Sequence, residues 1–106
     1  MTNSLVLCPI INYSVSKHLI SYKLNEMCNL VKAIDIKVVH AESFRLIKPS
    51  SSTLLREGKL NYIRDLVNKF SEITTKIDLL VFSVELSPIQ QRNLEKTLNL
   101  KILDKT

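Results

Sequence analysis

Apolar residues change their spacing several times along the chain, and the order of these changes constrains the fold more than any other sequence feature. Residues 5–11 form a continuous apolar run, which predicts a buried strand. The next apolar residues recur at intervals of three and four, which predicts a helix with one apolar face. These residues are Ile20, Leu24, Met27, Val31 and Ile34. Ser14 or Ser16 can cap the start of this helix. Residues 36–47 then predict a long or bent strand, interrupted near residues 40–42.

The second half of the chain continues the alternation of strand and helix. An apolar stripe at intervals of three and four predicts a second helix that begins near Gly58. It consists of Leu60, Ile63, Val67 and Phe70. Residues 77–84 are the clearest strand, and their apolar residues on both alternating faces predict helices on both sides of it. Residues 100–103 predict a short final strand.

A third helix is predicted to begin at Ser87. Pro88 would occupy the first helical position, where a missing amide costs no hydrogen bond. Gln90 follows Ser87 by three residues, which completes a capping box. Its apolar residues are expected to pack inward, namely Ile89, Leu94 and Leu98.

The order strand, helix, strand, helix, strand, helix, strand predicts an α/β fold. We expect one domain over residues 1–106, with a mostly parallel four-stranded sheet in a single layer and about three flanking helices. Pro9 cannot donate a hydrogen bond to a neighbouring strand, so the first strand is predicted to lie at a sheet edge or to end there. The last strand is short, and an exposed edge there would favour self-association.

Composition excludes several classes of protein. No apolar run approaches the roughly 20 residues of a membrane span, and the amino terminus lacks the features of a secretory signal. Cys8 and Cys28 have no metal-binding or disulfide-scaffold spacing, so both are expected to be buried thiols in a reducing compartment. His18 and His40 have no neighbouring ligand, so we expect no metal. We therefore expect a cytoplasmic protein.

The chain is basic, with 15 Lys and Arg against 10 Asp and Glu, a net charge of +5. This excess favours an anionic partner such as RNA, although the charges are dispersed and an ordinary solvated surface also explains them.

A glycine followed by lysine precedes the second helix and suggests a site for phosphate. Gly58 would let backbone amides approach an anion, with Lys59 and Arg56 beside it. A nucleotide-hydrolysing P-loop is excluded, because Thr53 replaces the required upstream glycine and Leu60 replaces the magnesium-binding Ser or Thr. Contact with an RNA backbone and a purely structural helix start both remain open.

Residues 85–95 are polar and follow the clearest strand, where ligands often bind in α/β sheets. Ser87 has no histidine nearby to activate it, so helix capping explains this serine better than catalysis does. We therefore expect no catalytic residue in this chain.

Three segments resemble the amino-terminal domain of the HflX GTPases. Residues 84–95, V-E-L-S-P-I-Q-Q-R-N-L-E, and residues 100–106, L-K-I-L-D-K-T, are similar to a family pattern that contains L-S-P-x-Q-x-R-N-L-E and ends in D-R-T. The stretch from Thr53 to Lys59 resembles the family's T-x-x-G-x-G-K. Arg56 departs from this pattern by replacing a glycine, and Lys105 by replacing an arginine.

The resemblance implies an α/β subdomain that precedes a helical hairpin and a G domain in the family's proteins. GTP and magnesium would belong to that G domain, so we expect a fragment without cofactor or enzymatic activity. HflX proteins bind the large ribosomal subunit, and some split ribosomes. The implied partners are the large subunit or its rRNA, or a separately encoded remainder that carries the G domain. The candidate RNA contacts are Arg56, Lys59, Arg92 and Lys105.

Two alternatives are left open by the sequence. One is a small domain that holds ATP or GTP phosphates over Gly58 and Lys59 without hydrolysis. The other is an inactive remnant of a gene.

Overall fold

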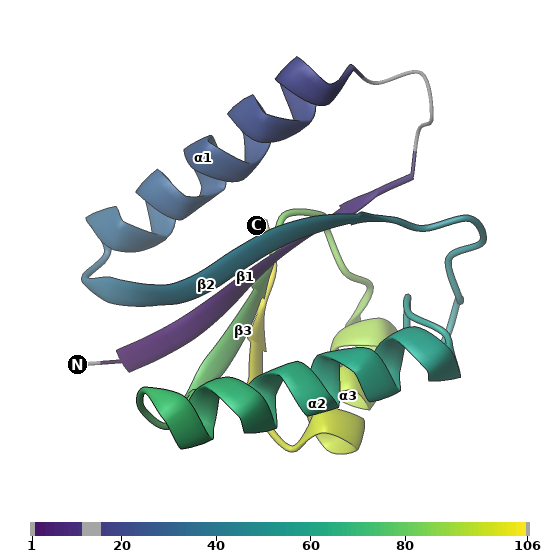
Figure 1. Ribbon diagram of the computed structural model, residues 1–106. Coiled ribbons are helices and arrows are strands. Elements are labelled where there is room, and N and C mark those ends of the chain that lie inside the picture. The colour runs from purple at the N-terminus through teal and green to yellow at the C-terminus, as the bar shows by residue number, and fades with distance from the viewer. Residues whose placement is uncertain (1, 12–15, 106) are drawn as a thin grey trace.

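The computed structural model describes residues 2–11 and 16–105. Within these residues, four strands and three helices alternate (Figure 1). The strands are β1 (Thr2–Ile10), β2 (Ile36–Arg45), β3 (Leu79–Phe82) and β4 (Lys101–Leu103). The helices are α1 (Lys17–Ala33), α2 (Glu57–Ile73) and α3 (Pro88–Leu98). All three strand pairings are parallel, which confirms the predicted α/β class.

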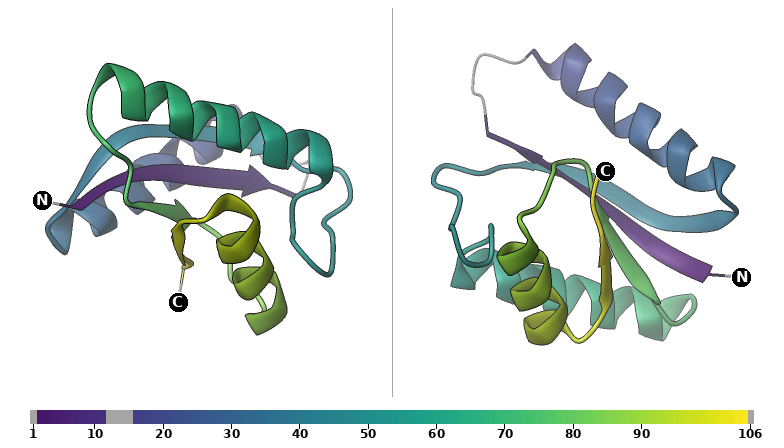
Figure 2. Two further views of the ribbon diagram at one scale, coloured as in Figure 1. Left: turned by 90° about the horizontal axis from the view of Figure 1, so that it is seen from below. Right: turned by 180° about the vertical axis from the view of Figure 1, so that it is seen from behind.

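The strands lie in the order β2-β1-β3-β4. Helix α1 covers one face of the sheet, while α2 and α3 cover the other (Figure 2). The connection after β1 leads to β2 on one side of β1, and the connection after β2 leads to β3 on its other side. The direction in which strands are added to the sheet therefore reverses between β1 and β3. In open α/β sheets, such a reversal opens a crevice at the carboxyl ends of the two strands.

The prediction that β1 lies at an edge is wrong, because β1 is paired on both sides. Pro9 is tolerated for a different reason. In a strand, successive residues point their amides to opposite neighbours, and the carbonyl of Leu7 accepts from Ser83 on the β3 side. Pro9 would therefore donate toward β3, which has already ended at Phe82. The missing amide removes no bond from the sheet.

Strand β2 is continuous through residues 40–42, where an interruption was expected. The irregularity is a bulge: Ser4 pairs with Val38, but the next residue, Leu5, pairs with His40. Val39 is therefore the extra residue. Both Val39 and Phe44 pack on the α2 side of the sheet, whereas Val38 packs on the α1 side.

The core consists of two clusters on opposite faces of the sheet. The larger lies under α2 and α3 and includes Leu5, Ile63, Phe82, Leu94 and Ile102, all fully buried. The smaller lies under α1. It contains Val6, Met27, Val31, Leu79 and Val81. β3 contributes to both clusters, which confirms that this strand is apolar on both faces.

The first residues of α1 and α3 are capped by side chains that were predicted from the sequence. The Ser16 hydroxyl accepts a hydrogen bond from the Leu19 amide at 3.2 Å and caps α1, whereas Ser14 lies outside the described residues. The capping box of α3 is confirmed, because the Ser87 hydroxyl accepts from the Gln90 amide and the Gln90 side chain accepts from the Ser87 amide.

Three side chains were predicted to be more buried than they are. Ile34 ends α1 as its C-cap and is 63% exposed. Ile89, in the first turn of α3, is 62% exposed, whereas Leu94 and Leu98 face the core. Cys8 is a buried free thiol as expected, but Cys28 is only half-buried. Its partial burial raises the pKa of the Cys28 thiol.

The different burial of two α3 residues predicts different effects on stability. Leu94→Ala should lower the free energy of unfolding by about 2–5 kcal/mol, because it leaves a cavity in the larger cluster. Ile89→Ala should change it by less than about 0.5 kcal/mol, because this side chain is exposed. Urea unfolding followed by circular dichroism measures both. Equal losses for the two variants would contradict the assigned helix face.

Candidate functional site

Two side chains of α3 hold the loop that leads into α2. The Gln90 side-chain amide donates to the Ser50 carbonyl at 2.9 Å, and the Asn93 amide donates to the Ser52 carbonyl at 2.8 Å. These contacts join segments that are 40 and 41 residues apart in sequence. We call residues 48–56 the α2 entry loop and these two contacts the amide clamp.

The entry loop is folded tightly on itself. Ser50 and Leu54 exchange two backbone hydrogen bonds of 2.9 Å. Leu54 has a φ of 65°, a left-handed conformation that is costly for a leucine, and its side chain is buried. Burial of Leu54 and Leu55 in the larger cluster holds this conformation in place. The Arg56 guanidinium donates to the Lys48 carbonyl at 3.1 Å and closes the loop.

Other polar residues of α3 and its surroundings also bond to backbone. The Gln91 amide donates to the Ile102 carbonyl at 3.1 Å, and the Glu95 carboxylate accepts from the Ile102 amide at 3.3 Å. Asp104 accepts from the Leu86 amide at 2.9 Å. These side chains therefore connect α3 to β4 and to the entry loop. Their hydrogen bonds hold the backbone of the domain together.

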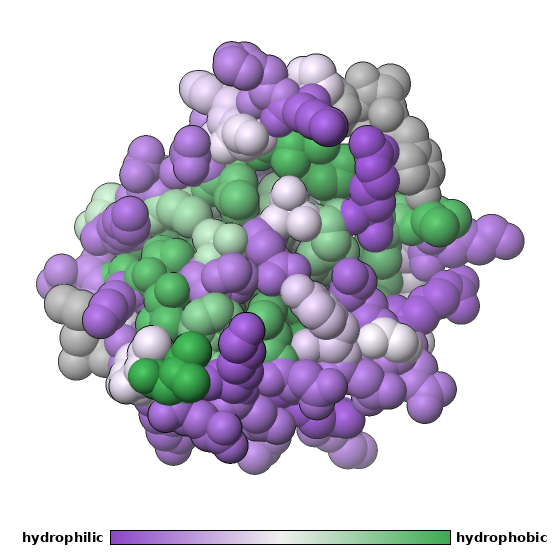
Figure 3. Space-filling model, viewed as in Figure 1, coloured by the Kyte–Doolittle hydropathy of each residue, from purple (hydrophilic) through white to green (hydrophobic). Residues whose placement is uncertain are grey.

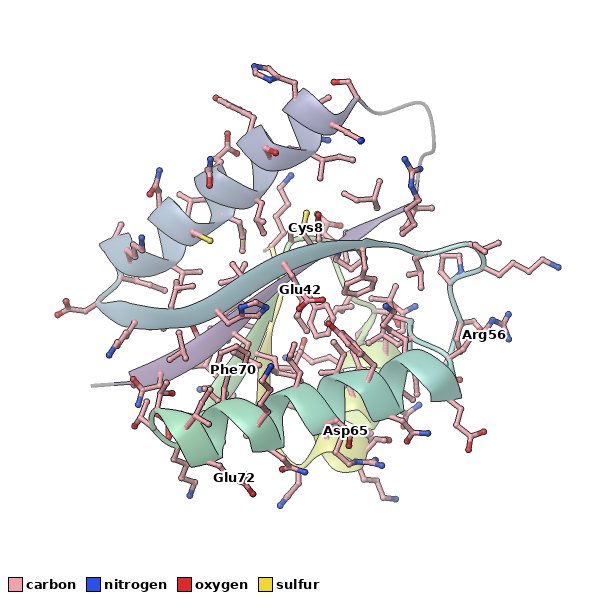
Figure 4. All side chains as sticks on the ribbon, viewed as in Figure 1. Cys8, Glu42, Arg56, Asp65, Phe70 and Glu72 are labelled. Carbon is pink, nitrogen blue, oxygen red and sulfur yellow. The ribbon has the colours of Figure 1, made fainter. Side chains whose placement is uncertain are left out.

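The amide clamp brings together the segments that carry two of the four candidate RNA contacts. Arg56 is the N-cap residue of α2 and projects outward from the entry loop (Figure 4). Arg92 lies on α3, next to the Asn93 that holds that loop, and is also exposed. The other two candidates lie elsewhere. The Lys59 ammonium is 4.5 Å from the centre of the Phe44 ring, and Lys105 lines a cavity beside α1.

Gly58 has an ordinary helical position in the first turn of α2. It has no positive φ, and a Cβ added to it would meet no atom within 4 Å. The Glu57 carboxylate lies in the same turn, and its negative charge occupies the end of the helix that would attract a phosphate. Lys59, the other residue of the suggested phosphate site, is half-buried against aromatic rings.

An acidic and aromatic cluster lies between β2 and α2 and was not predicted from the sequence. Glu42, labelled in Figure 4, accepts hydrogen bonds from the Tyr62 hydroxyl at 2.9 and 3.1 Å and lies 2.8 Å from the His40 ring. The His40 ring stacks on Phe70, with 4.7 Å between centres. The bond to Glu42, followed by weaker burial and charge effects, raises the pKa of Tyr62. This cluster attaches edge strand β2 to α2.

The part of the chain that the structure describes contains no group of three metal-ligating side chains. Within the same residues, no helix has the length and apolar character to cross a membrane.

The position of Gly58 predicts that alanine is tolerated there. Gly58→Ala should raise the free energy of unfolding by about 0.5–1 kcal/mol, because alanine favours a helix and loses less entropy on folding. Urea unfolding of the variant tests this. A loss of stability would show that α2 needs a glycine at its start.

The Glu42 contact predicts a pH dependence at alkaline pH. Because the pKa of Tyr62 is raised by folding, the stabilisation should be complete below pH 10.0 and should disappear as pH rises through the pKa of the folded state. Ultraviolet titration of the tyrosinates measures this pKa. Glu42→Gln should move the Tyr62 pKa back toward its ordinary value, and a titration that is unchanged in this variant would contradict the assignment.

The chain is similar to known proteins in sequence and in fold. Residues 21–106 match the family described as GTP-binding GTPase N-terminal. The chain is 40% identical over 83 residues to GTPase HflX of Chlamydia pneumoniae, a match that covers 78% of this chain and 17% of that protein. It is 30% identical over 101 residues to GTPase HflX of Flavobacterium psychrophilum, covering 95% of this chain and 23% of that protein. The chain thus spans about a fifth of the length of these relatives.

Solved structures support the fold independently. Crystal structures of two SsGBP variants superpose with TM-scores of 0.60 and 0.61, at 20% and 23% identity. Each match covers 99% of this chain and 29% of the other chain. The family match extends over most of the described residues and includes all three segments that resemble HflX. The chain therefore belongs to the GTP-binding GTPase N-terminal family, as the amino-terminal α/β domain of an HflX-type protein.

Proposed function

We propose that this domain is a non-catalytic RNA-binding module of an HflX-type GTP-binding protein, which contributes to binding the large ribosomal subunit in the cytoplasm. The observation that carries the proposal is the amide clamp. It holds a basic loop rigidly against a helix that carries a second exposed arginine. The Arg56 guanidinium is held by its bond to the Lys48 carbonyl, which suits a phosphate contact because less side-chain entropy is lost when RNA binds.

Arg56 and Arg92 are the principal contacts in this proposal, since both are exposed and their segments are joined by the clamp. Lys59 contributes less, because its ammonium already interacts with the Phe44 and Tyr62 rings. Lys105 would make a separate contact, since it lies beside α1 rather than at the entry loop. The net charge of +5 would add long-range attraction to the RNA.

GTP and magnesium are assigned in this proposal to polypeptide beyond this domain. The matched region is 17–23% of the length of these relatives, which leaves room for a G domain outside it. The first turn of α2 favours this assignment over a nucleotide at Gly58, because Glu57 would repel a phosphate there. A polypeptide that carries the G domain is the second partner we propose.

Ribosome pelleting at several salt concentrations tests the proposal. Binding of the wild-type domain to large subunits should weaken steeply as salt rises. Arg56→Ala combined with Arg92→Ala should weaken binding and reduce the slope of log affinity against log salt by about 1.4–1.8, at 0.7–0.9 for each lost phosphate contact.

Lys32→Ala provides the matched control, because this lysine is exposed on α1, away from the entry loop. In this control, the slope of log affinity against log salt should stay closer to the wild-type value than it does in the double variant. A wild-type domain that fails to pellet with large subunits at low salt would contradict the proposal. Equal slopes for the control and the double variant would contradict the assignment of the two arginines.

A further inference from the structure

Helix α1 borders a groove on the less covered face of the sheet. A cavity of about 250 Å³ lies between α1 and the carboxyl ends of β1 and β3, where the direction of winding reverses. Leu19 and Leu30 line it from the helix, and Ile11 and Val84 line it from the strand ends. Figure 3 shows apolar side chains gathered below α1 on the β2 side of the molecule, whereas the groove lies on the opposite, β3 side. Because α1 is the one described helix on this face, the part of the sheet beside α1 is not covered by a second described helix (Figure 2).

The side of α1 that faces this groove carries apolar residues with two charges between them. Leu19 is 42% exposed and Leu30 is 56% exposed. Lys23 and Glu26 are exposed between them and also line the cavity. Neither charge forms an ion pair within residues 2–11 and 16–105. A helix face with this combination can bury its leucines on a partner that also neutralises both charges.

The order of these four residues makes the stripe complementary to itself. Leu19, Lys23, Glu26 and Leu30 follow one another at intervals of four, three and four, so they share one side of the helix. The spacing is the same when the stripe is read from either end, but the lysine and the glutamate then appear in the opposite order. When two copies of α1 pair antiparallel about a two-fold axis, Leu19 therefore faces Leu30 of the second copy. Lys23 likewise faces Glu26, and each contact occurs twice.

We propose that α1 is a self-association surface, on which a second copy of this domain pairs antiparallel through Leu19, Lys23, Glu26 and Leu30. The partner helix would lie along the side of α1 that borders this groove. This surface differs from the edges of the sheet, where backbone groups rather than charges would determine pairing.

Charge reversal tests the proposal by sedimentation equilibrium of the domain. Wild type should dimerise, and Lys23→Glu should weaken dimerisation by at least about tenfold, because it places two pairs of like charges in contact. Glu26→Lys should do the same. A mixture of the two single variants should form a heterodimer, because every facing pair is then of opposite charge. The double variant with both substitutions should again form a homodimer.

Lys32→Glu is the control, since Lys32 lies about two and a half turns after Lys23 and so on the opposite side of α1. It should dimerise as the wild type does, and circular dichroism should show that every variant is folded. A wild-type domain that remains monomeric would overturn the proposal and assign the groove to another occupant, such as further polypeptide of the HflX-type protein. Single variants that dimerise normally, or a mixture that stays monomeric, would overturn it equally.

Discussion

Hydrogen bonds from amide side chains of α3 to backbone carbonyls organise one end of this molecule. Without the Gln90 and Asn93 contacts, residues 50–53 would lose their hydrogen bonds to α3, and the burial of Leu54 and Leu55 would remain to attach the loop to the core. Leu54 would then have less to offset its left-handed backbone. The clamp fixes both the loop and the start of α2. The position of Arg56 depends on it.

Hydrogen bonds from side chains to backbone also explain why α3 and its surroundings contain so many polar residues. Gln91 and Glu95 bond to the two backbone groups of Ile102, and Asp104 bonds to the amide of Leu86. A short strand such as β4 has few ladder bonds of its own, so these side chains help to hold it. Several residues that carry the resemblance to HflX therefore stabilise the domain. The exposed Arg92 side chain lies among them but makes no such hydrogen bond to the described backbone.

Local features were predictable from the sequence, and long-range contacts were not. The capping box at Ser87 and the order of elements follow from patterns within a few residues. The edge position predicted for β1 was wrong, because the effect of Pro9 depends on where β3 ends. Exposure of Ile89 depends on how α3 is rotated against the sheet.

The candidate site shows the same division. Arg56 and Arg92 could be named from charge and resemblance, but their common location depends on hydrogen bonds between residues about 40 positions apart. The spacing of apolar residues along the sequence does not indicate a contact between residues so far apart. The Glu42 and Tyr62 contact, 20 positions apart, was missed for the same reason. The apolar stripe of α1 was recognised, whereas the exposed stripe beside it required the structure to show which face is uncovered.

The central claim is that α3 holds the entry loop through two side-chain amides. Amide hydrogen exchange of the loop, residues 50–56, measures this directly in a variant that combines Gln90→Ala with Asn93→Ala. We expect faster exchange at the amides of Ser50 and Leu54, which close the loop, while the amides of β1 remain protected. Arg92→Ala should leave the loop unchanged. Loop exchange equal to that of the wild type in the double variant would contradict the account.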